Sequence, residues 1–152
     1  MNNNERQILI QKARAKCELE RRKALAGFWE YCLYYDGQFF SQRTFLKKVA
    51  SAFMRVFEAY AGGKSYSLAV SMPPRSGKSY ITSLFVSWMI GKFPEESVMR
   101  NCCSDTLYQK LSYDTRDIIR SSKFQKIFPD VRLKGDKQNV RGWSVEQARQ
   151  VT

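Results

Sequence analysis

The segment Met72–Ser79 combines residue types that together can hold a phosphate group. It ends in Gly77-Lys78-Ser79, and the glycine lets backbone and phosphate approach closely because it has no Cβ. Lys78 would supply a positive charge on a long stem, and Ser79 a small oxygen ligand for Mg²⁺. Where such a tripeptide opens a helix, backbone amides of the first turn also point at the anion. The spacing therefore predicts a P-loop, a loop that binds nucleotide phosphates.

The standard P-loop motif is present only in part. Its eight-residue form has a further glycine five residues before Gly77, where this chain has Met72. The neighbouring patterns support the assignment, because Tyr66–Met72 alternates as a strand does and apolar residues then recur at helical spacing from Lys78 to about Lys92. The tripeptide thus stands at a predicted strand-to-helix junction, where a helix N-terminus would face an anion. The alternative is an unrelated turn with a surface lysine.

Helices are predicted over most of residues 1–64. From Glu5 to about Tyr35 there is no proline and only one glycine, which favours one or two helices. The first helical region is expected to end at Asp36-Gly37. Apolar residues then recur every three or four positions over Gln42–Tyr60, which predicts an amphipathic helix that faces a core.

The C-terminal part alternates strands and helices. After the helix that begins at Lys78, Ser97–Cys103 is predicted to form a second strand, and Ser104-Asp105 to provide the N-cap of a helix that extends to about Ile119. Beyond Pro129 the composition is typical of a loop. Since strands that alternate with helices favour a parallel sheet, the expected fold is α/β. It comprises an incomplete, P-loop NTPase-like parallel sheet in residues 65–152, preceded by a helical segment in residues 1–64.

Composition excludes several classes of enzyme site. The chain has 152 residues and no histidine, so Ser-His-Asp and Cys-His nucleophilic sites, histidine-ligated zinc and histidine proton shuttles cannot be built. The four cysteines form no C-x-x-C pair, which favours reduced, buried thiols. The N-terminus lacks the apolar core of a secretory signal, and Ile81–Ile90 is too short an apolar stretch to span a bilayer. A cytoplasmic protein with no membrane partner is expected.

The positive charge is spread over the whole chain. The formal net charge is +12, and residues 1–64 hold 12 basic and 6 acidic groups while residues 65–152 hold 14 and 8. Such charge favours a polyanion such as nucleic acid as partner, because neutralised phosphates release counterions. An ordinary basic, solvated surface is the alternative.

The run SLAVSMPPRSGKS, Ser67–Ser79, resembles the Walker A segment of the large terminase subunits of tailed bacteriophages, in which the form MPPR-x-GKS is common. The resemblance extends to roughly Phe39–Asp130. Its further parts are the aromatic pair Phe39-Phe40, the helix over Gln42–Tyr60, the stretch Cys102–Ile119 and the tripeptide Phe128-Pro129-Asp130.

The resemblance implies an ATPase motor that drives double-stranded DNA into a procapsid. Its cofactors would be ATP and Mg²⁺. Its partners would be double-stranded DNA, the portal protein, the small terminase subunit and, when full length, further copies of itself. It would work in the host cytoplasm, transiently at the procapsid portal. Full-length members of the family carry a second, nuclease domain.

Carried over by position, the resemblance assigns Gly77, Lys78 and Ser79 to the phosphates and Mg²⁺. Arg75 matches a loop arginine that would contact the γ-phosphate, where a delocalised cation can meet charge developing on the transferred group. A DNA-facing role or a structural ion pair is the alternative for Arg75. The nucleotide-binding residues expected from the loop as a whole are Pro74, Arg75, Ser76, Gly77, Lys78, Ser79 and Tyr80.

One departure from the family limits the expected activity. Hydrolysis needs an apolar strand that ends in Asp, followed by a Glu that activates water, and neither follows the loop. The apolar run Cys32–Asp36 lies before the loop and is interpreted as a helix end. Carboxylates for a two-metal nuclease are missing too. We therefore expect the N-terminal part of a terminase ATPase, which binds ATP without turnover by itself. The alternatives are another DNA-dependent P-loop ATPase, such as a helicase, or a non-catalytic basic module that binds DNA or portal.

Overall fold

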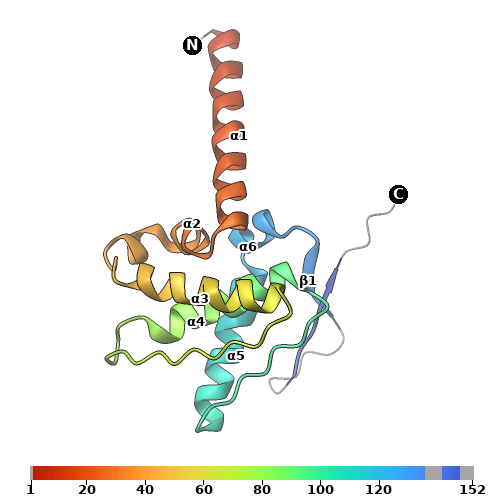
Figure 1. Cartoon of the computed structure of the whole chain (residues 1–152). Coiled ribbons are helices and arrows are strands. Elements are labelled where there is room, and N and C mark those ends of the chain that lie inside the picture. The colour runs from red at the N-terminus through yellow and green to blue at the C-terminus, as the bar shows by residue number, and fades with distance from the viewer. Residues whose placement is uncertain (1, 136–141, 148–152) are drawn as a thin grey trace.

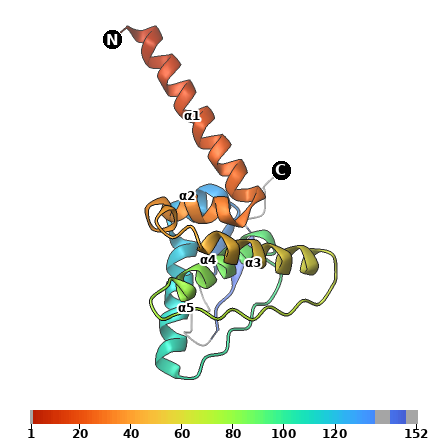
Figure 2. The same ribbon diagram turned by 60° about the vertical axis from the view of Figure 1, so that its left-hand side comes forward.

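The computed structural model describes residues 2–135 and 142–147 and is mostly helical (Figure 1). Helix α1 projects from a body formed by the other elements, as Figures 1 and 2 both show. The elements are α1 (Asn3–Ala26), α2 (Phe28–Ser41), α3 (Leu46–Ala61), α4 (Lys78–Lys92), α5 (Asp105–Arg120), α6 (Ser122–Ile127), β1 (Val131–Leu133) and β2 (Val145–Gln147).

The prediction of a parallel sheet is wrong. Among the described residues the sheet consists of β1 and β2 alone, which pair antiparallel with Val131 opposite Gln147. The two segments expected as strands, Tyr66–Met72 and Ser97–Cys103, form no ladder within the described ranges. A strand requires a neighbour that accepts and donates its backbone hydrogen bonds, and an alternating sequence does not supply that neighbour.

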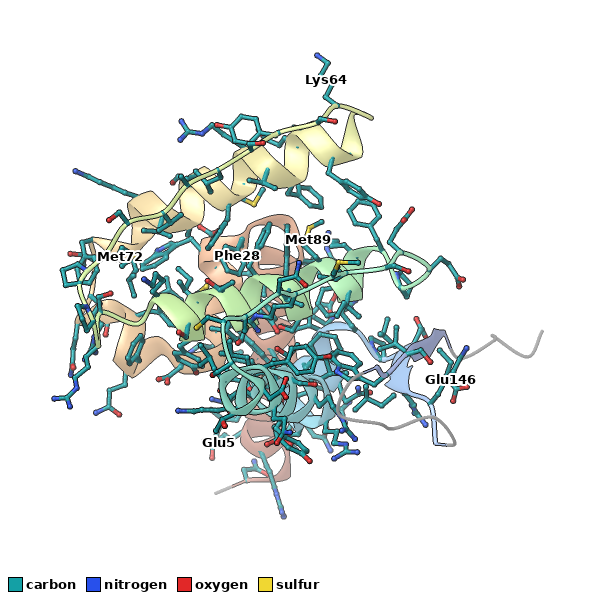
Figure 3. All side chains as sticks on the ribbon, turned by 90° about the horizontal axis from the view of Figure 1, so that it is seen from below. Glu5, Phe28, Lys64, Met72, Met89 and Glu146 are labelled. Carbon is teal, nitrogen blue, oxygen red and sulfur yellow. The ribbon has the colours of Figure 1, made fainter. Side chains whose placement is uncertain are left out.

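The side chains of Tyr66–Met72 nevertheless alternate in their burial. Leu68, Val70 and Met72 are half-buried, whereas the residues between them are exposed. Figure 3 shows Lys64 and Met72 near opposite ends of α3, so the chain between them runs back beside that helix. The period of two therefore describes which side chains face the body, although the segment belongs to no sheet.

Helix boundaries agree best with expectation where the signals are local. Helix α4 begins at Lys78 and ends at Lys92, as predicted. The Ser104 hydroxyl oxygen accepts a hydrogen bond from the Leu107 amide at 3.3 Å, so Ser104 caps α5 as predicted. Helix α3 begins at Leu46 and not at Gln42, because the preceding residues form a turn in which the Leu46 amide donates to the Arg43 carbonyl oxygen at 2.9 Å.

One expectation is confirmed and another is corrected. The first helical region breaks at Asp36 as predicted, since the backbone there is non-helical, with φ −145° and ψ 74°, and a short second helical piece then continues α2 to Ser41. The hairpin of β1 and β2 lies in the region beyond Pro129 that was expected to be a loop. Its strands are too short, three residues each, to give a periodic signal.

The core is built around α4. The Trp88 side chain is fully buried, and its indole N–H donates to the Ala24 carbonyl oxygen at 3.0 Å. The Phe28 ring lies 5.1 Å from that of Phe85 and 5.9 Å from that of Trp88. Aromatic rings from α2 and α4 thus form one buried cluster that fixes the direction of α4, and the half-buried Phe53 of α3 packs edge-on against Phe28 at 5.9 Å.

The predicted apolar face of α3 is only partly buried. Phe45, which precedes the helix, is 50% exposed and Tyr60 is 42% exposed, whereas Leu46 and Ala50 are fully buried. The expectation of buried thiols holds for Cys32 alone, since Cys17 and Cys103 are exposed and Cys102 is half-buried. The described helices include no segment whose length and hydropathy would let it cross a bilayer.

Stability is expected to fall at alkaline pH. Burial raises the pKa of Tyr31 and of Cys32 above their ordinary values. The unfolded chain releases these protons near its ordinary pKa values while the folded chain retains them, so the free energy of unfolding declines as pH rises above about 9. Urea unfolding at about pH 7.5 and about pH 10.5 should differ by on the order of 3 kcal/mol.

Cys32→Ala provides the test of that assignment. The thiol has the lower ordinary pKa of the two groups, so removing it should abolish most of the alkaline decline. An unchanged dependence on pH in Cys32→Ala would show that other groups cause the decline.

Candidate phosphate-binding loop

The loop before α4 turns tightly. Gly77 is the N-cap of α4, with φ 94°, and Arg75 also has a left-handed backbone, with φ 61°. Ser76 Oγ donates to the Pro73 carbonyl oxygen at 2.7 Å and closes the turn. Glycine adopts such a backbone readily, whereas for arginine it is strained. A strained residue held in place by its surroundings is a common feature of ligand-binding loops.

The amides of the loop are free to bind a ligand. In the described part of the chain, the amides from Gly77 to Tyr80 donate to no protein acceptor, and the first helical bond runs from the Ile81 amide to the Gly77 carbonyl oxygen at 3.0 Å. The first turn of α4 contains no acidic residue that would compete for these amides. Unpaired amides at a helix N-terminus carry partial positive charge and form a site for an anion.

The polar side chains of the loop are also accessible. Arg75, Lys78 and Ser79 are exposed, and within residues 2–135 and 142–147 none of the three side chains has a hydrogen bond or an ion pair. Two cations and a hydroxyl thus accompany the free amides. An anion at this point would meet both backbone dipoles and full positive charges.

A cavity of about 470 Å³ adjoins the first turn of α4. Ser79 and Tyr80 line it from α4, and Asp114 and Asp117 line it from α5. Its volume is in the range of ligand pockets. The remaining lining residues are Tyr35, Ser83, Leu107, Lys110, Leu111 and Ile118.

Mg²⁺ would fit this donor set only together with a phosphate ligand. The Ser79 hydroxyl and the two carboxylates are hard oxygen donors, which Mg²⁺ prefers. Among the described residues, however, no three His, Cys, Asp or Glu residues gather into a metal site. Mg²⁺ characteristically completes its coordination with water and phosphate oxygens, so Ser79 can hold it beside a nucleotide.

An aromatic wall lies behind the loop. A Cβ atom on Gly77 would lie 2.8 Å from Cζ of Phe39, which is too close for any side chain. The Phe39 ring is itself held by the Arg43 guanidinium, 4.1 Å from its centroid, and by the Tyr80 ring at 5.1 Å. Glycine is therefore required at residue 77 for space as well as for backbone conformation.

The predicted site residues are not all exposed. Pro74, Arg75, Lys78 and Ser79 are exposed, and Ser76 and Gly77 are half-buried. Tyr80 instead contacts α2, where its ring stacks on Phe40 at 5.7 Å. Sequence reasoning missed the contact between Phe39 and Gly77, and its only signal was the aromatic pair Phe39-Phe40 upstream of the loop.

The chain matches no family model, and no curated protein or solved structure matches it. The likeness of Ser67–Ser79 to terminase large subunits therefore stays a prediction. What the loop can bind has to be derived from its own geometry.

Proposed function

We propose that the chain binds the triphosphate of ATP at the N-terminus of α4 and is the nucleotide-binding part of a DNA-packaging motor of the terminase type. The observation that carries this proposal is the row of unpaired amides from Gly77 to Tyr80 at the start of a 15-residue helix, next to the exposed ammonium group of Lys78. Backbone amides, helix dipole and lysine charge all favour a polyphosphate there.

Each part of the loop has a separate task in this proposal. The amides near Gly77 bind phosphate oxygens, Lys78 bridges the terminal phosphates, and Arg75 contacts the γ-phosphate. Bound Mg²⁺ would supply charge neutralisation between the β- and γ-phosphates, with Ser79 as its protein ligand. The aromatic wall of Phe39 holds Gly77 in place, so that little reorganisation is needed when the anion binds.

Turnover is not part of the proposal for this chain alone. No apolar strand ending in Asp-Glu occurs in the sequence after the loop, and the activation of water requires such a carboxylate. The chain would bind ATP and retain it unhydrolysed. The proposed setting is the host cytoplasm, at a procapsid portal, with double-stranded DNA, the portal protein and the small terminase subunit as partners and a homo-oligomer as the full-length assembly.

Isothermal titration with a series of phosphate ligands tests the proposal. ATP and ADP are expected to bind more tightly than AMP, and inorganic tripolyphosphate to compete with ATP, because the loop recognises the phosphate chain. Equal binding of ATP and AMP would contradict a site for the terminal phosphates. If the chain does not bind ATP, the proposed function is wrong.

A basic nucleic-acid module is the second candidate, because α1 projects from the body and carries exposed cations. Four of these exposed cations are Arg6, Lys12, Arg14 and Lys16. This candidate predicts an affinity for DNA that falls steeply as the salt concentration rises and that does not change when ATP is added. Binding of DNA in the absence of any affinity for ATP would favour it over the motor.

A further inference from the structure

We infer that Asp36 is a positioning residue for the phosphate-binding loop, which it holds through Tyr80 and Phe39. This inference rests on the proposed function. One Asp36 carboxylate oxygen, Oδ2, accepts a hydrogen bond from the Tyr80 hydroxyl at 3.2 Å, and the other, Oδ1, accepts one from the Phe39 amide at 3.1 Å. Tyr80 directly follows the predicted Mg²⁺ ligand Ser79. A single carboxylate thus connects the kink of α2 to the first turn of α4.

The kink brings Phe39 to the loop. Asp36 leaves helical geometry, and its carboxylate then caps the short second half of α2 by accepting the Phe39 amide. The Phe39 ring occupies the space where a side chain of residue 77 would lie, and it meets the Tyr80 ring edge-on. Asp36 therefore fixes both aromatic neighbours of the loop, one behind Gly77 and one on α4.

The Asp36 carboxylate is half-buried and engaged through both oxygens. It acts on the loop through Phe39 and Tyr80, and it is not assigned to phosphate or metal.

The molecule contains a matched control for this contact. Tyr31 on α2 and Ser87 on α4 are joined by a hydroxyl hydrogen bond of 3.0 Å, which is buried. This bond also ties α2 to α4, but it lies seven residues further along α4 than Tyr80. If the link between Asp36 and Tyr80 served only to hold the two helices together, removing either bond would have the same effect on the loop.

The experiment compares Tyr80→Phe with Tyr31→Phe, each of which loses one hydroxyl group. Tyr80→Phe is expected to weaken ATP binding by about 3- to 10-fold, because the first turn of α4 is no longer held. Tyr31→Phe should change the affinity by less than about twofold, although it lowers the urea midpoint more. Equal effects of the two substitutions on the affinity would overturn the inference.

A double-mutant cycle shows whether Asp36 acts through Tyr80. Asp36→Ala should weaken ATP binding more than Tyr80→Phe, since it also frees Phe39. Adding Tyr80→Phe to Asp36→Ala should then have no further effect, because the partner is already lost. If the effects of the two substitutions on ATP affinity are additive, the inference is wrong. Asp36→Asn should weaken ATP binding less than Asp36→Ala, since its amide oxygen still accepts a hydrogen bond.

A measurement without nucleotide separates this inference from the proposed function. In ¹⁵N-labelled protein, Tyr80→Phe should shift the amide resonances of Gly77, Lys78 and Ser79 and speed their hydrogen exchange, whereas Tyr31→Phe should not. If the wild-type chain fails to bind ATP but these changes are seen, the proposed function fails and the positioning role stands. Unchanged loop amides in Tyr80→Phe would overturn the positioning role itself.

Discussion

Lys78→Ala is expected to weaken ATP binding by about 10- to 100-fold and to leave the free energy of unfolding within about 0.5 kcal/mol of the original value. The loss in affinity follows from removing a charged hydrogen-bond donor from the terminal phosphates. The unchanged stability follows from the structure, because the Lys78 side chain is exposed and has no hydrogen bond or ion pair in the described part of the chain. Calorimetric titration with ATP and urea unfolding measure the two quantities.

Lys47→Ala is the matched control for Lys78→Ala. Lys47 is likewise exposed and lies on α3, outside the loop, and its loss changes the net charge by the same amount. If positive charge attracted ATP only in a general way, both substitutions would therefore lower the affinity for ATP by the same amount. If Lys47→Ala lowers the affinity as much as Lys78→Ala does, the nucleotide is attracted by the basic surface and has no specific site at α4.

Gly77→Ala is expected to destabilise the fold by about 2–4 kcal/mol. A left-handed backbone with φ 94° is unfavourable for alanine, and the new methyl group would lie 2.8 Å from the Phe39 ring. Phe39 cannot move aside freely, because Arg43, Phe40 and Tyr80 surround its ring. Urea unfolding measures the loss, and ATP affinity should fall with it because the loop is displaced.

Gly63→Ala separates the two causes of that loss. Gly63 also has a left-handed backbone, with φ 68°, but a Cβ there would meet no atom within 4 Å. Gly63→Ala should therefore lower the free energy of unfolding only through the backbone conformation, by about 1 kcal/mol. If Gly77→Ala and Gly63→Ala destabilise the chain equally, the Phe39 ring does not restrict the residue type at position 77.

Sequence reasoning located the parts of the site that depend on neighbouring residues. The start of α4 at Lys78 follows from a change of apolar period, and the Ser104 cap follows from residues within one turn. These two features were predictable because their physical causes lie within a few positions of one another. The residue types of Arg75–Ser79 also have local geometric reasons, and their binding of a phosphate stays a prediction.

The features that were missed depend on distant residues. The kink at Asp36 is held by Tyr80, which is 44 positions later, and no local pattern indicates such a contact. Phe39 was visible as part of an aromatic pair, but its place behind Gly77 depends on how α2 packs on α4. The expected sheet failed for a similar reason: Tyr66–Met72 has the period of a strand, whereas a ladder depends on a neighbouring segment that the period does not specify.

The central claim is that unpaired backbone amides at the start of α4 bind a polyphosphate. Titration of ¹⁵N-labelled protein with Mg-ATP, followed by amide chemical shifts, tests it most directly. The account predicts saturable shifts that are largest for the amides between Arg75 and Tyr80, with tripolyphosphate moving the same resonances and AMP leaving them nearly unchanged. Shifts confined to α1 or to other basic surfaces, with the amides of Gly77, Lys78 and Ser79 unmoved at saturation, would contradict it.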